Sequence, residues 1–285
     1  MADPLASFLL RKNIAIQSYL PAEEGLIVAY DNGYTHWYID LSLPCDALEQ
    51  WSTKRVKCLA DDMDIKNISP IIHGNFNAPL SSNIPILREA AVSYVKRELE
   101  LAAQFSAPVI IHGGAIVEPR LVTAAKRSAI DNFVKSIKEL YEYGTELGVR
   151  VWVENLSNYT NNHPFYYIFS TRSEFRYVLE KCPELEIFLD LGHANIGNDN
   201  IHDLIGEFSH NISGISLSNN NGMRDQHFQM VKGSVDYSLV FNKLIKTNWF
   251  GFLAFEVRDL PPDKVLRQAR TLYKEVLFEN AISCV

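Results

Sequence analysis

The sequence predicts a single (β/α)8 barrel, or TIM barrel, that spans residues 1–285. Short strand-like apolar runs alternate with helical patterns eight times, and no second domain interrupts or follows them. Six of the runs end in, or just before, a His, Glu or Asp. Because the active sites of such barrels lie at the carboxyl ends of the strands, these endings predict a site together with the fold.

The predicted strands are short runs of apolar and β-favouring residues. They span residues 13–19, 34–41, 68–73, 108–112, 149–154, 185–190, 212–218 and 251–256. The predicted helices lie after Pro21 and at residues 45–66, 85–105, 120–147, 171–182, 199–208, 234–247 and 262–279. Each helix but the last separates two strands, which is the connection that parallel neighbouring strands require.

Local signals support these elements in chain order. Glu23 and Glu24 lie in the opening turn of the first helix, where acidic side chains suit the helix dipole. The second strand is rich in aromatic residues, and a polar loop at residues 74–83 separates the third strand from a long amphipathic helix. Gly148 is expected to end the fourth helix, directly before the fifth strand.

A doubly wound open sheet is the alternative for any alternating pattern of strands and helices. It fits less well, because no Gly-x-Gly-x-x-Gly turn follows the first strand and no P-loop is present in the sequence. We therefore expect the strands to close into a barrel.

Composition and charge limit the functions that fit the chain. With 47% hydrophobic and 21% charged residues and no linker or low-complexity segment, the chain is expected to form one globular domain. The net charge of -7 and the pI near 5.6 leave no broad basic surface, so nucleic acid is not an expected partner. No apolar run approaches the roughly 20 residues of a membrane span, and no signal peptide is evident, so a cytoplasmic protein is expected. The cysteines are scattered and are expected as reduced thiols: Cys45, Cys58, Cys182 and Cys284.

The segment from Leu185 to His193, Leu-Glu-Ile-Phe-Leu-Asp-Leu-Gly-His, is the first candidate for a strand that carries metal ligands. Its apolar run ends in Asp190, and Gly192 is expected to let the chain turn so that His193 points back beside the carboxylate. Such a pair alone is more often structural, as a helix cap or a hydrogen-bonded pair. The Asp190–His193 pair becomes a stronger candidate because other predicted strands also end in possible metal ligands.

Eight residues at or beyond strand ends are predicted to converge on one metal centre. They are His73, His112, Glu154, Asp190, His193, Asp225, His227 and Glu256. So many titratable groups without a counter-charge would repel and desolvate one another. A divalent cation resolves this conflict, and imidazole with carboxylate suits zinc, manganese, iron or cobalt, with magnesium less favoured.

These motifs resemble those of the xylose isomerase-like TIM barrels, the superfamily that also holds endonuclease IV. The most specific pieces are Val153-Glu-Asn-Leu156 and Leu189-Asp-Leu-Gly-His-Ala-Asn195, with Arg224-Asp-Gln-His227 and Phe255-Glu-Val257 in the expected order. The resemblance to the sugar isomerases and epimerases implies one metal held by Glu154, Asp190, a His at the end of strand seven, and Glu256. The resemblance to endonuclease IV implies three metal positions, with His73 and His112 beside Glu154 at one and His193, Asp225 and His227 at another.

The strand-seven motif departs from the family pattern. The family usually has His-Leu-His-Asp-Asn-Asp-Gly, whereas this chain has Ser216-Leu-Ser-Asn-Asn-Asn-Gly222, so a weak ligand occupies the His position and two acids become Asn219 and Asn221. Farther on, Lys232 stands where a carboxylate is usual. These changes leave three alternatives: a site on Glu154, Asp190 and Glu256 completed by water, a metal shifted toward His193, or no catalysis.

The primary prediction is a metal-dependent isomerase or epimerase of a small sugar-like polyhydroxy carbonyl compound, acting through an enediolate. Glu154 and Glu256 are the predicted acid and base. The predicted substrate contacts are His193, Lys232 and Ser216.

Two other functions remain as alternatives. The first is an endonuclease IV-like phosphodiesterase, and the second is a barrel that binds a ligand without turnover. The segment 159–167, with His163 and three tyrosines, is either a lid over the substrate or a packed loop. Assembly into a homo-oligomer stays open.

Overall fold

Eight parallel strands close into a barrel, which confirms the predicted fold. The computed structural model describes residue 10 and residues 12–17, 19–117, 120–159, 165–197 and 200–282. The barrel strands are β1 (Ile14–Ile16), β2 (His36–Asp40), β3 (Ser69–His73), β4 (Val109–His112), β6 (Val151–Glu154), β8 (Glu186–Asp190), β9 (Ile212–Leu217) and β10 (Phe252–Phe255). They follow one another around the barrel in the order β1-β10-β9-β8-β6-β4-β3-β2, so the first strand closes the ring between β10 and β2.

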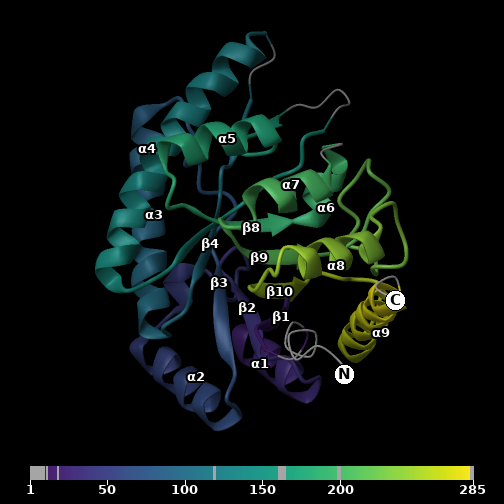
Figure 1. Ribbon diagram of the computed structural model, residues 1–285. Coiled ribbons are helices and arrows are strands. Elements are labelled where there is room, and N and C mark those ends of the chain that lie inside the picture. Colours follow the sequence, from purple (N-terminus) through teal and green to yellow (C-terminus); the bar gives the residue numbers. More distant parts are fainter. Residues whose placement is uncertain are drawn as a thin grey trace.

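Helices cover the outside of the barrel, as Figure 1 shows. They are α1 (Ala22–Asp31), α2 (Thr53–Lys66), α3 (Pro85–Gln104), α4 (Val122–Leu147), α5 (Arg172–Lys181), α6 (Leu191–Ile196), α7 (Ile201–Phe208), α8 (Tyr237–Lys246) and α9 (Pro262–Ile282), with a 3-10 turn at Leu48–Gln50. Their apolar faces pack on the outer face of the strands and form the larger of two hydrophobic clusters. None of the described helices is long and apolar enough to cross a membrane.

Capping residues explain where the helices begin and end. The predicted start of the second helix at residue 45 is wrong, because Ser52 accepts a hydrogen bond from the Arg55 N–H and starts α2 at Thr53. Likewise α8 begins after Asp236, which accepts from two backbone N–H groups of its first turn. Gly148 ends α4 as predicted, with φ 69° in the left-handed region that glycine tolerates best.

The structure contains short elements that the sequence did not reveal. Strands β5 (Ala115–Ile116) and β7 (Tyr166–Tyr167) pair antiparallel outside the barrel, and α6 follows directly on β8. Two of these lie beside predicted site residues, since β5 comes three residues after His112 and α6 contains His193. Of the predicted features, residues 160–164 of the proposed lid, Ser18, Asp199 and Cys284 lie outside the described residues.

Aromatic rings fill the inside of the barrel below the strand ends. Trp152 and Phe188 stack at 5.4 Å between ring centroids, and Phe252 lies against Trp152 at 5.0 Å. Above them the Tyr38 ring stacks on the His73 ring at 5.7 Å. The interior is therefore a packed core whose upper layer supports the first histidine of the predicted site.

Candidate metal centre at the carboxyl ends of the strands

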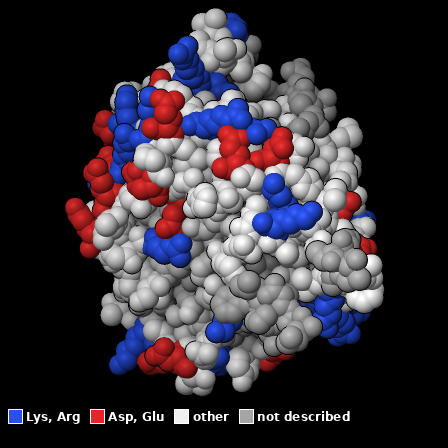
Figure 2. All heavy atoms as spheres, viewed as in Figure 1, with Lys and Arg blue, Asp and Glu red and all other residues white. Residues whose placement is uncertain are grey.

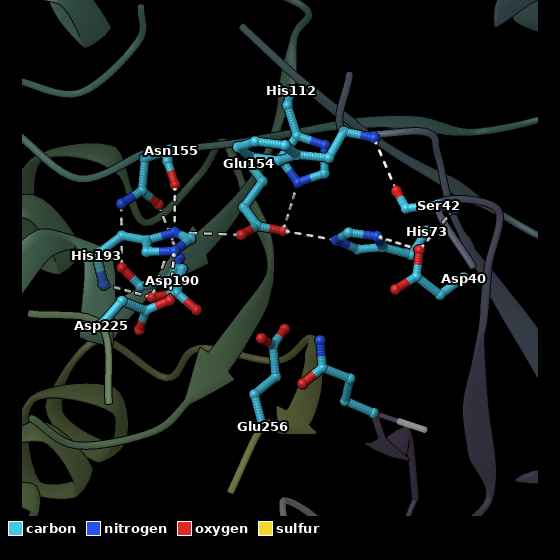
Figure 3. Close-up of polar contacts among 12 residues, drawn as sticks. Asp40, Ser42, His73, His112, Glu154, Asn155, Asp190, His193, Asp225 and Glu256 are labelled. Atoms are coloured by element: carbon cyan, nitrogen blue, oxygen red, sulfur yellow. Dashed lines mark hydrogen bonds and ion pairs between the residues drawn. The ribbon is translucent and has the colours of Figure 1, made fainter. Parts of the chain in front are cut away.

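Glu154 lies at the middle of the predicted site (Figure 3). It ends β6, and only 2% of it is exposed. Its Oε2 atom lies 3.4 Å from Nε2 of His112 and 3.7 Å from Nε2 of His73, and its Oε1 atom lies 3.3 Å from Nδ1 of His193. One carboxylate thus joins the histidines of β3 and β4 to the histidine that follows β8.

Asp190 and His193 are placed by hydrogen bonds to the end of β6. The Asn155 side chain donates to the Asp190 carbonyl at 3.0 Å and accepts from the Asp190 N–H at 2.7 Å, which continues the pairing of β6 with β8 by one residue. Asp190 in turn caps α6, because its Oδ1 accepts from the His193 N–H at 2.5 Å. The helix, not a glycine turn, brings His193 back toward the carboxylate. Gly192 is needed for space, since a Cβ atom there would lie 2.5 Å from Oγ of Ser218.

A second part of the centre comes from the loop after β9. Asp225 lies between two rings, with its Oδ2 atom 2.9 Å from Nε2 of His227 and 3.5 Å from Nε2 of His193. The His227 ring also lies 3.8 Å from the Glu256 carboxylate, which follows β10. The structure therefore brings His193, Asp225, His227 and Glu256 to one side of Glu154.

In three of the histidines, Nδ1 lies close to an oxygen that can accept its proton. Nδ1 of His193 pairs with the Asn155 carbonyl at 2.8 Å, and Nδ1 of His227 pairs with the Glu256 carbonyl at 2.9 Å. Nδ1 of His73 lies 3.4 Å from the Asp40 carboxylate. When Nδ1 carries the proton toward such an acceptor, the Nε2 lone pair faces the centre, which is the arrangement that orients histidines in metal sites.

Several buried atoms of the centre have no hydrogen-bond partner among the described residues. They are Oε2 of Glu154, Oδ2 of Asp190, Oδ1 of Asp225, Oε1 of Glu256, Nδ1 of His112 and Oγ of Ser216. Buried polar atoms are normally satisfied, and an unpaired carboxylate oxygen is especially unfavourable. A divalent cation bound by these oxygens and by the inward-facing Nε2 atoms would satisfy them, so the residues fit the predicted metal.

Ligand atoms approach one another closely in two sets of three among the described residues. The first set is His73, His112 and Glu154, and the second is Glu154, Asp190 and His193, each with ligand atoms within 4.8 Å of one another. Glu154 belongs to both sets. The geometry thus suits a metal on either side of Glu154, with its two oxygens turned in opposite directions.

The electrostatics differ sharply between the two glutamates. Burial raises the pKa of Glu256, and the charges of Glu154 and Asp190 raise it further, to about 7. Burial also acts to raise the pKa of Glu154, but the rings of His112, His193 and His73 outweigh it and hold that pKa well below its usual value. Glu154 is therefore a fixed negative charge, whereas Glu256 gains and loses a proton near neutral pH.

Ser216 and the asparagines behind it have different roles in the structure. Ser216 lies on β9 between Asp190 on β8 and Ala254 on β10, fully buried. Asn219 donates to the carbonyls of Met230 and Val235 and accepts from the N–H of Val235. Asn219 therefore holds the loop that carries Asp225, a task for which an amide, with both donor and acceptor, suits better than a carboxylate.

Lys232 contacts residues outside the predicted site. Its ammonium pairs with Asp259 at 3.0 Å and lies 4.0 Å from the ring centroid of Phe228. The predicted substrate contact by Lys232 thus finds no support in its described contacts.

Asp40 and Asn155 are functional candidates that the sequence analysis missed. Asp40 ends β2, next to His73 in register, and so it follows the same strand-end pattern as the predicted ligands. Asn155 stood in the quoted Val-Glu-Asn-Leu motif, but a polar residue one position beyond a ligand gave no sign of pairing with another strand.

Comparisons with known proteins agree with this architecture. A family model described as xylose isomerase-like TIM barrel matches residues 28–276. The uncharacterized protein MJ1311 of Methanocaldococcus jannaschii is 23% identical over 296 residues, which cover 98% of this chain and 94% of that protein. Among solved structures, a D-tagatose 3-epimerase-like protein has a TM-score of 0.79 at 20% identity, covering 94% of this chain and 99% of its own. The 3-keto-D-glucoside 4-epimerase YcjR of E. coli has a TM-score of 0.71 at 16% identity, covering 92% and 99% of the two chains.

Proposed function

The chain belongs to the xylose isomerase-like TIM barrel family, and from this membership we propose that it is a divalent-metal-dependent isomerase or epimerase of a small sugar-like polyhydroxy carbonyl compound. Structural neighbours that act as sugar epimerases support this class of reaction. The observation that carries the proposal is the set of unpaired carboxylate oxygens on Glu154, Asp190 and Glu256, at the end of the barrel where this fold binds substrates.

In the proposed reaction, different residues of the site bind the metal, transfer the proton and hold the substrate. Glu154, Asp190 and the inward-facing histidines would hold the cation, which supplies Lewis-acid polarisation of the substrate carbonyl. Glu256, which gains and loses a proton near neutral pH, would remove a proton from carbon and return one to it, while Glu154 stays ionised and holds the cation. His193, fixed by Asn155, is oriented to hold a substrate oxygen.

Exchange of substrate protons with solvent tests this proposal. Protein loaded with zinc, manganese, cobalt or iron is incubated with ketoses in D₂O, and deuterium at the carbon beside the carbonyl is followed by NMR. We expect exchange by the wild type and none by Glu256→Gln, which keeps the shape of the side chain but cannot accept the proton. Exchange at the wild-type rate in Glu256→Gln would contradict the assigned role.

A metal-dependent phosphodiesterase is the second candidate, and one observation favours it. His73 and His112 form a compact ligand set with Glu154, which a single-metal isomerase does not need. Against it stands the charge of the molecule: the net charge is -7, and on the face shown in Figure 2 the described basic side chains are interspersed with acidic ones.

Paired variants separate these candidates from a barrel that only binds its ligand. His73→Ala and His112→Ala are expected to leave ketose exchange measurable, whereas a hydrolytic cluster would lose all nicking of a duplex with an abasic site. Nicking without exchange in the wild type would overturn the isomerase proposal. Neither activity in metal-loaded protein would favour the binding barrel.

A further inference from the structure

Arg258 is a cation at the rim of the metal centre that no described carboxylate neutralises. It follows Glu256 by two residues, and its backbone N–H donates to the His227 carbonyl at 2.9 Å. Within the described residues its side chain forms a hydrogen bond and a cation–π contact with Tyr19, whose ring centroid lies 4.6 Å from the guanidinium and whose hydroxyl accepts from Nε at 2.6 Å, and it forms no ion pair. Both terminal Nη groups are therefore left for a ligand.

Several other cations among the described residues have acidic partners. Lys232 is paired with Asp259 at 3.0 Å. Arg150 and Arg172 pair with carboxylates at 2.6 Å and 2.8 Å. Arg258 has no such partner among the described residues, and it lies two residues beyond Glu256 with its backbone N–H bonded to the His227 carbonyl. The position of Arg258 beside the centre suggests that its counter-charge arrives with the substrate.

Tyr19 fixes the direction of the guanidinium. Its hydroxyl accepts from Arg258 and donates to the Gln17 side chain, and the Gln17 N–H donates to the Phe255 carbonyl at 3.1 Å. Burial raises the pKa of Tyr19, and the charge of Glu256 raises it further, so the hydroxyl stays a neutral donor.

We propose that Arg258, held by Tyr19, binds a carboxylate at the end of the substrate remote from the metal, so that the substrate is a keto sugar acid. The inference rests on the proposed isomerase function. Two parallel N–H groups of a guanidinium match the two oxygens of a carboxylate. A phosphate dianion would need more positive charge than one arginine supplies two residues from Glu256, and Lys232 is already paired with Asp259.

Three ligands that differ only at carbon 6 test the proposal: D-fructose, D-fructuronate and D-fructose 6-phosphate. Their affinities for zinc-loaded protein are measured by calorimetry, together with deuterium exchange. We expect the wild type to bind fructuronate about 10- to 100-fold more tightly than fructose, the range of a charge-assisted hydrogen-bonded pair. In Arg258→Met this ratio should fall to about one, and in Tyr19→Phe it should fall in part, because the guanidinium loses its anchor.

Arg267→Met is the matched control, since Arg267 lies on α9 and pairs with Asp263 at 3.1 Å. The ratio should be unchanged in that variant. An unchanged ratio in Arg258→Met, tighter binding of fructose 6-phosphate than of fructuronate, or no binding of fructuronate by the wild type would each overturn the proposal. Exchange of fructose without any preference for the acid would overturn this inference alone. Binding of fructuronate that depends on Arg258, without exchange of any ketose, would overturn the isomerase function and leave the anion site.

Discussion

The two ends of the barrel treat carboxylates in opposite ways. At the amino end, Glu186 begins β8 and accepts from Arg150 at 2.6 Å, from Nε1 of Trp152 at 2.6 Å and from Ser213 at 2.7 Å. At the carboxyl end, Glu154 and Asp190 each keep a buried oxygen without a hydrogen-bond partner. The difference fits the proposed metal centre, where oxygens without donors of their own would bind a ligand.

The largest effect is expected at the carboxyl end of the barrel, when glutamine replaces Glu154. Glu154→Gln should lower kcat/KM for the exchange reaction at least about 1000-fold, or about 4 kcal/mol, because a neutral amide holds a divalent cation poorly. Bound metal, measured by mass spectrometry of the purified protein, should fall with it. Wild-type metal content in Glu154→Gln would contradict the placement of the centre.

Glu98 can be compared with the carboxylates of the metal centre, because it is also buried near the carboxyl end of the barrel but lies outside the centre. Its Oε1 accepts from the Asn75 N–H at 2.9 Å, and its Oε2 has no described partner. Burial raises the pKa of Glu98 from 4.5 to about 7. A raised acid pKa contributes stability that is present below the unfolded value and is lost as the pH rises through the folded value.

Glu98→Gln should therefore remove a pH dependence. Between pH 5 and pH 8.5 the free energy of unfolding of the wild type should fall by about 2 to 3 kcal/mol relative to the variant. Urea unfolding at both pH values measures it. Parallel stability curves for the two proteins would show that Glu98 is already ionised at no cost.

At the amino end, Glu186→Gln should cost stability and leave function alone. The loss of the charged acceptor shared by Arg150, Trp152 and Ser213 should lower the free energy of unfolding by about 1 to 2 kcal/mol, since the carboxylate is partly exposed. Metal content and exchange rate should match the wild type, because the two ends are separated by the aromatic core. A loss of metal in Glu186→Gln would mean that the two ends are coupled.

Ser216→His gives the smallest expected effect and adds a ligand instead of removing one. Ser216 is buried beside Asp190 with an unpaired hydroxyl, so an imidazole there should tighten metal binding about tenfold. Metal competition with a chelating dye measures the affinity. Ser216→Ala is the control and should bind as the wild type does; equal affinity in all three proteins would place the metal away from β9.

Strand ends could be predicted from the sequence because both the fold and the ligands follow from local patterns. Apolar runs that stop at His73, His112, Glu154 and Asp190 predicted four positions that the structure does bring together. Parallel strands in a barrel deliver such endings to one rim, so a one-dimensional pattern was enough.

The rest depended on contacts between distant segments. Nothing in the sequence indicated that Asp259 pairs with Lys232, that Asp40 supports His73, or that Arg258 rests on Tyr19, 239 residues earlier in the chain. Helix starts were misplaced where a capping residue overrode the hydrophobic pattern, as at Ser52. The short pair β5 and β7 consists of two-residue strands, too short for a periodic signal.

Two hydrogen bonds between the Asn155 side chain and the Asp190 main chain connect two strand ends that carry predicted ligands. They join the ends of β6 and β8 beyond the last backbone pair, so we expect Glu154 and Asp190 to move together. The Asp190 amide should then be among the slowest in the chain to exchange its hydrogen with solvent. Asn155 is therefore expected to keep the distance between Glu154 and Asp190 constant when the loops around them change conformation.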